Sequence, residues 1–154
     1  MAIFTGTDVA DTLDGGAEAD TIIGKLGSDA ITGGAGNDTI YGGSGITDTA
    51  DSADTIGGGG GNDLIYGNAG NDYISGASGR DTVHSGIGDD TIIYTASAEA
   101  EEIHGGDGND GIASGSGNDL LYGGLGIDYV GGGAGNDTIY GGQGSSSTTD
   151  GSDT

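Results

Sequence analysis

Acidic residues recur along the chain every nine residues, and their carboxylates are the groups best suited to chemistry. The clearest unit is 33–41, Gly-Gly-Ala-Gly-Asn-Asp-Thr-Ile-Tyr, which returns almost unchanged at 58–66 and 132–140. In this frame the chain gives fourteen complete units and an incomplete fifteenth, and position 6 is acidic in every one. Calcium prefers oxygen ligands from carboxylates and backbone carbonyls. The spacing therefore predicts a series of calcium sites.

The predicted metal ligands are the position-6 aspartates of the regular units. They are Asp20, Asp29, Asp38, Asp54, Asp63, Asp72, Asp81, Asp90, Asp110, Asp119, Asp128 and Asp137. Loop backbone would supply further oxygens around Gly33, Gly34, Gly36, Gly58, Gly61, Gly67, Gly70, Gly76, Gly79, Gly88, Gly105, Gly108, Gly117, Gly123, Gly126, Gly132 and Gly135. Solvated turns and an acidic disordered linker are the competing interpretations. Neither explains an acid at all fifteen positions together with an aliphatic residue at position 8 of all fourteen complete units.

Composition limits what the chain can do. Its 154 residues include 25 acids and two bases, and only 32% are hydrophobic. Low hydrophobicity with high net charge predicts disorder unless a cation neutralises the acids, so we expect ion binding to supply folding free energy. The charge disfavours nucleic acid and anionic membranes as partners. The sequence has no apolar run of the kind that marks a signal peptide or a membrane span, and it has no cysteine.

The position-8 residues indicate which elements hold the acids. An amphipathic helix needs three or four apolar residues in two turns, whereas here one aliphatic residue occurs in nine. This spacing favours very short strands separated by glycine turns. We expect one all-β domain over 1–154, with regular repeats over 6–140.

The unit resembles the G-G-x-G-x-D-x-U-x nonapeptide of the RTX (repeats-in-toxin) family, where U is a large aliphatic residue. The resemblance implies a right-handed parallel β-roll, a β-solenoid with two nonapeptides in each coil. Two short-stranded parallel sheets would enclose the position-8 side chains, with six-residue loops alternating between two edges. Each ion would lie between loops of neighbouring coils. Pairing the well-formed loops predicts about eight to ten ions.

Several units depart from the pattern. Extra residues at 47–53 add Asp48 and Asp51, which predicts a surface loop or, alternatively, an extra ion site or partner contact. The tenth unit, 94–104, has extra residues at 99–100 and no loop glycine, so it should interrupt one row of ions. Weaker binding is expected in the first three units. The last repeat, 145–154, is incomplete and expected to be flexible, and the natural protein is expected to continue or to be completed by another molecule.

Aromatic residues occupy position 9 of alternate units. They are Tyr41, Tyr66, His84, His104, Tyr122 and Tyr140. On one sheet they would stack as a ladder at about 4.8 Å per coil. The ladder would stabilise the sheet or form a contact surface for self-association, another protein or a glycan. A catalytic role for the histidines is disfavoured because a flat sheet offers no pocket.

The sequence thus predicts a calcium-binding structural β-roll rather than an enzyme. It would be secreted or displayed on the cell surface by type I secretion, fold on binding Ca²⁺ after export, and self-associate through its ends or its ring ladder. The alternative is a folding and secretion module of a larger secreted enzyme, adhesin or toxin. Ice binding is disfavoured because no unit has threonine at position 3.

Overall fold

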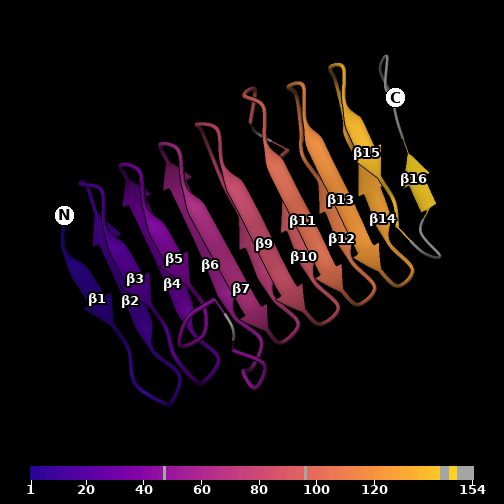
Figure 1. Ribbon diagram of the computed structural model, residues 1–154. Coiled ribbons are helices and arrows are strands. Elements are labelled where there is room, and N and C mark those ends of the chain that lie inside the picture. The colour runs from indigo at the N-terminus through magenta and orange to yellow at the C-terminus, as the bar shows by residue number, and fades with distance from the viewer. Residues whose placement is uncertain (47, 96, 143–145, 149–154) are drawn as a thin grey trace.

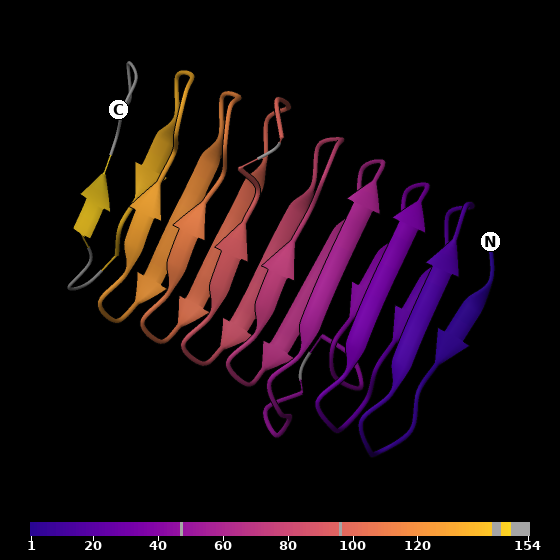
Figure 2. The same ribbon diagram turned by 180° about the vertical axis from the view of Figure 1, so that it is seen from behind.

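The computed structural model describes residues 1–46, 48–95, 97–142 and 146–148, which form short strands joined by loops. The strands are β1 (Ile3–Thr5), β2 (Thr12–Gly16), β3 (Thr21–Ile23), β4 (Ala30–Ala35), β5 (Thr39–Tyr41), β6 (Thr55–Gly60), β7 (Leu64–Ala69), β8 (Tyr73–Ser75), β9 (Thr82–Ile87), β10 (Thr91–Ile93), β11 (Glu102–Asp107), β12 (Gly111–Ala113), β13 (Leu120–Leu125), β14 (Tyr129–Gly131), β15 (Thr138–Tyr140) and β16 (Ser146–Thr148). Figures 1 and 2 show them as two layers, with loops along both long edges and the termini at opposite ends.

The strands form two sheets in which every pair is parallel. One sheet contains the odd-numbered strands β1 to β15 and the other the even-numbered strands β2 to β16. Each strand pairs with the strand one coil away, which is two repeat units along the chain, as Ile22 pairs with Ile40. The insertions lengthen this step without breaking the register, because Ile40 still pairs with Ile65 and Val83 with Ile103. The predicted parallel β-solenoid with two nonapeptides per coil is confirmed, whereas its handedness stays a prediction.

The core is a single row of position-8 side chains between the sheets. From Ile22 to Val130 these residues are at most 3% exposed, and Phe4, Leu13 and Ile139 pack against the row at its ends. Neighbouring side chains along a strand point to opposite faces, so positions 7 and 9 face outward. None of the described residues forms a helix long and apolar enough to cross a membrane. Because each nonapeptide contributes one core residue, the sheets are thinly packed and the loops must add to their stability.

The inserted residues of the fifth unit lie as a loop against the roll, below β5 and β6 in Figure 1. Asn68 Nδ2 donates to Gly45 O over 2.8 Å, and Gly27 N–H donates to Asp51 Oδ1 over 3.2 Å. Asp48 accepts N–H bonds from within the loop. These bonds support the interpretation as a surface loop that is attached to the sheet and the neighbouring coil.

The predicted incomplete repeat, 145–154, lies largely outside the described residues. Its described part is β16, Ser146–Thr148, which pairs in parallel with β14. The even-numbered sheet therefore extends into this repeat.

Candidate metal sites

The position-6 carboxylates form two columns, one along each edge of the roll. In each link one carboxylate oxygen, Oδ1 of an aspartate or Oε2 of Glu101, accepts the backbone N–H of the position-6 residue one coil earlier, as Asp81 accepts from Asp63 over 2.8 Å. The twelve links measure 2.7–3.0 Å and join residues 18 to 25 apart. All twelve predicted ligands lie in these columns and are at most 5% exposed.

The second carboxylate oxygen points into the loop and, unlike the first, has no hydrogen-bond partner in most of these residues. In nine of these residues Oδ2 is buried without a hydrogen-bond partner. They are Asp29, Asp38, Asp54, Asp63, Asp72, Asp81, Asp90, Asp110 and Asp119. A buried carboxylate with an unsatisfied oxygen is strongly unfavourable unless it is paired or coordinates a metal. The loops therefore present a repeated series of buried carboxylate oxygens that have no protein partner and could bind a cation.

Position-1 glycines leave the space beside these oxygens open. A Cβ added to Gly33 would lie 2.6 Å from Asp38 Oδ2 and 2.4 Å from Gly58 O in the next coil. The same test at Gly105 gives 2.5 Å to Asp110 Oδ2 and 2.4 Å to Gly123 O. Any side chain here would enter the space between a carboxylate and a carbonyl. Glycine thus keeps two oxygen ligands exposed to one small cradle.

Burial strongly perturbs the acidity of these groups. Desolvation raises the pKa of Asp72 to about 8, and those of Asp54, Asp81 and Asp110 to about 7. Hydrogen bonds from backbone N–H groups oppose the rise, and neighbouring carboxylates add to it. At neutral pH the roll therefore needs either protons or cations in its loops.

Calcium suits this arrangement better than a metal that requires a cluster of charged ligands. Among the described residues no three His, Asp or Glu side chains converge on one point, so an ion must take most of its ligands from backbone carbonyls. Calcium accepts six to eight such oxygens in flexible geometry. The orphaned Oδ2 atoms, the inward carbonyls and the open glycine cradles all fit it. Its assignment to particular residues stays a prediction.

The N-terminal loop satisfies its acid without a metal. Asp11 Oδ2 accepts both the N–H and the hydroxyl of Thr7, at 2.5 and 2.8 Å, and these bonds lower the pKa of Asp11. At position 2 of the third unit, Lys25 has φ of 82°, a left-handed backbone conformation that glycine adopts more readily. Both features support weaker ion binding at this end.

The fold and the two columns of position-6 carboxylates together define a parallel β-solenoid whose loops are suited to calcium. Comparison with protein-family models matches the RTX calcium-binding nonapeptide repeat over residues 5–40, 48–83, 57–92, 95–130 and 122–145. The chain belongs to this family. The repeat is itself non-catalytic, and no catalytic family was found. A comparison with curated proteins found no match.

A second hydrogen-bonded ladder at position 5 is absent from our sequence-based predictions. Asn37 Oδ1 accepts Asn62 N–H, and Asn62 Oδ1 accepts Arg80 N–H, both over 2.9 Å. Similar links join Asn118 to Asn136 over 2.9 Å and Asn109 to position 5 of the next coil. The recurrence of asparagine at this position was the available signal. These amides satisfy loop N–H groups and hold successive loops in register beside the acidic columns.

The predicted ring ladder is present on the outer face of the odd-numbered sheet. Its five consecutive ring pairs have centroids 4.4–5.2 Å apart and interplanar angles of 4–26°. The rings lie face to face, so each covers its neighbour and leaves mainly its edge to solvent. A sugar ring therefore cannot stack on faces inside the ladder, which favours sheet stabilisation over glycan binding.

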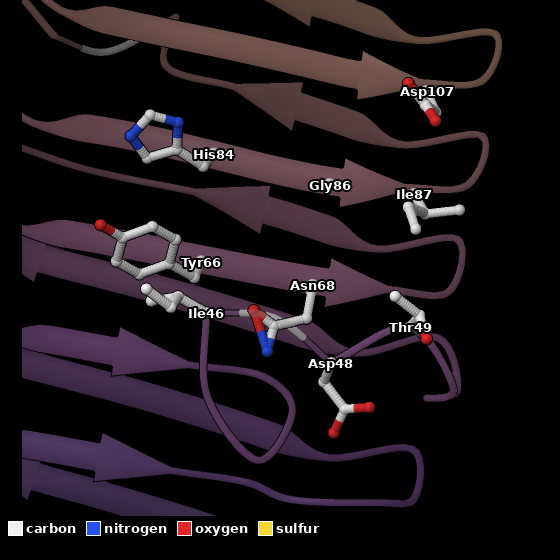
Figure 3. A pocket seen from close by; sticks show the side chains of 9 residues that line it. All are labelled: Ile46, Asp48, Thr49, Tyr66, Asn68, His84, Gly86, Ile87 and Asp107. Atoms are coloured by element: carbon white, nitrogen blue, oxygen red, sulfur yellow. The ribbon is translucent and has the colours of Figure 1, made fainter.

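The inserted loop and the odd-numbered sheet enclose a shallow hollow of about 480 Å³ (Figure 3). Ile46, Asp48 and Thr49 line it from the loop, and residues of β7, β9 and β11 form its floor. Figure 3 places Asp48 and Asp107 at opposite ends. The two carboxylates do not converge on a common ligand position.

Proposed function

We propose that this protein is a calcium-binding structural β-roll, exported in an unfolded state and folded outside the cell when Ca²⁺ fills its loops. It has no catalytic role of its own. The observation that carries the proposal is the pair of acidic columns with buried, unpartnered Oδ2 atoms. They make the folded chain unfavourable without cations, and ion-binding free energy then becomes folding free energy.

The calcium gradient across the cell envelope would give this coupling its direction. Extracellular calcium modules bind with dissociation constants of roughly 10⁻⁴–10⁻³ M, so cytosolic calcium would leave such a chain unfolded and ready for export. RTX proteins typically use type I secretion, which supports this route. Calcium outside would then fold the chain and make export irreversible.

Circular dichroism of the purified chain tests the proposal. In calcium we expect a β-type spectrum, and in excess chelator a spectrum of disordered chain. Magnesium is the matched control, because its smaller, near-octahedral coordination suits carbonyl-rich loops poorly. A β-type spectrum that persists in chelator at neutral pH would refute coupled folding.

Assembly would allow such a roll to act as a surface scaffold. A terminal coil presents unpaired backbone N–H and C=O groups, which can template pairing with another chain. We propose that folded chains associate end to end in calcium, where ions also reduce repulsion between acidic loops. The aromatic ladder offers a second, lateral contact surface.

The alternative function is a folding and secretion module within a larger secreted enzyme, adhesin or toxin, and the family membership favours it as much as the first. Electron microscopy of the native protein with and without calcium separates the two. Calcium-dependent filaments or lattices built from the roll support the scaffold, whereas a discrete particle carrying a further domain supports the module.

A further inference from the structure

Tyr94 occupies position 1 of the tenth unit, where the regular units have glycine. Its side chain is fully buried and runs beneath Gly76 in the preceding coil of the same edge. A Cβ added to Gly76 would meet the ring at 2.0 Å from Cε1 and 2.5 Å from Cζ, with Asp81 Oδ2 at 2.7 Å. The tyrosine ring thus lies in the cradle beside the Asp81 carboxylate.

In the corresponding cradle of a regular loop, the two nearest atoms are both oxygens. Beneath Gly67, the same point lies 2.4 Å from Asp72 Oδ2 and 2.5 Å from Ser85 O of the next coil. A cation can approach both oxygens there. At Gly76 the two nearest atoms are instead aromatic carbons of Tyr94, which fill the space beside the Asp81 carboxylate that an ion would need.

The other acid of this coil pair, Glu101, is satisfied by protein donors. Glu101 Oε2 accepts Asp81 N–H over 2.7 Å, and Glu101 Oε1 accepts the Ser97 hydroxyl. Glu101 is 1% exposed, yet neither of its oxygens is left without a partner. The loop therefore closes through hydrogen bonds at the position where its neighbours present a free anionic oxygen.

We propose that the Tyr94 side chain takes the place of one calcium ion and joins the eighth and tenth units without metal. The proposal rests on the proposed function, because it requires ions in the regular loops. The row of ions along this edge is then divided at the coil pair around Tyr94.

Counting bound ions in the full chain tests the proposal. We expect Tyr94→Gly to bind one more calcium ion per chain than the wild type at saturating calcium, measured by equilibrium dialysis with atomic absorption. Tyr94→Phe keeps the ring in the cradle and should bind the wild-type number. An unchanged count in a folded Tyr94→Gly variant would overturn the proposal, as would a gain in Tyr94→Phe.

Two isosteric variants test the same point without disturbing the tyrosine. Asp63→Asn removes a free oxygen in a regular loop of the same edge and should lower the ion count by at least one. Asp81→Asn should leave the count unchanged, because the Tyr94 ring fills the cradle beside Asp81 Oδ2, although that oxygen has no hydrogen-bond partner. An equal loss in both variants would overturn the proposal while leaving the proposed function intact. A wild-type chain that binds no calcium would overturn both.

Discussion

Asp72→Asn should stabilise the calcium-free roll and make its folding depend less steeply on calcium. Asp72 is 2% exposed, and its Oδ1 accepts Asp54 N–H over 2.9 Å while its Oδ2 has no partner. Asparagine keeps the shape and the Oδ1 acceptor but removes the charge and the free anionic oxygen. The substitution therefore separates the backbone link from the proposed role as a cation ligand.

The expected magnitudes follow from the environment of this carboxylate. Burial raises its pKa from 3.8 to about 8, so at pH 7.5 it opposes calcium-free folding by up to about 5 kcal/mol, at about 1.4 kcal/mol per pH unit. Asparagine removes this cost. In calcium the variant also loses an ion, which offsets about 2.7 kcal/mol of this gain if free calcium is a hundred times the dissociation constant.

Two folding titrations measure these effects. The calcium titration of folding should become less steep in Asp72→Asn, because one ion fewer binds on folding. In calcium-free buffer, folding driven by the excluded osmolyte trimethylamine N-oxide should require less osmolyte than in the wild type. Asp107→Asn is the matched control, because Asp107 is an exposed mid-roll aspartate and should change neither titration appreciably. Destabilisation of equal size in both buffers would show that Asp72 serves only its backbone hydrogen bond.

Three further predictions follow from the same geometry. In the folded roll the pKa of Asp63 is about 6 and that of Asp72 about 8, above the unfolded value of 3.8. The calcium-free roll should therefore be most stable below about pH 4 and lose stability as the pH rises to about 8. Circular dichroism of the calcium-free chain should show β structure gained on acidification, and a flat profile would contradict this. Gly33→Ala should destabilise the calcium-bound roll by about 1–3 kcal/mol, because its Cβ would lie 2.4 Å from a carbonyl oxygen. Gly57→Ala should be tolerated, because the nearest neighbour of its Cβ would lie at 3.9 Å. Thermal melts of both variants test this, and equal losses of stability would show that the space beside Gly33 is not critical. In calcium at about 1 mM, light scattering should detect association that increases with protein concentration, and a strictly monomeric protein would exclude assembly through the coil ends.

Much of the architecture could be predicted because the repeat is short and nearly unbroken. A row of identical residue types at a fixed period can stack in register only if successive coils are parallel, so the position-8 row, the acidic columns and the ring ladder follow from the frame. Tyr41 and Tyr66 are separated in sequence by the inserted loop, yet they stack with centroids 5.2 Å apart, as the repeat frame predicts. The insertion changes the loop length without changing the frame.

Features that depend on one side chain reaching another coil could not be predicted in this way. Asn68, at a position usually held by glycine, has φ of 83° and uses its amide to hold the inserted loop. The sequence indicated that the tenth unit was a poor cage, but only the structure placed the Tyr94 ring beside Asp81. Side-chain direction within an irregular loop is set by the packing of neighbouring coils, which the repeat does not encode.

The sequence by itself determined the periodic properties of this protein: which residues face the core, which acids share an edge and which rings share a face. The core-facing positions follow from a fixed period and from the alternation of side chains along a strand. The shared edges and faces follow from the coil of two nonapeptides that the family resemblance implies. The tertiary structure decided how each carboxylate is used. One oxygen binds the backbone of the preceding coil, and the other is left free, capped by a hydroxyl or covered by a ring. The environment of the second oxygen depends on distances between neighbouring coils, because a single side chain there can fill the space beside the carboxylate or leave it open.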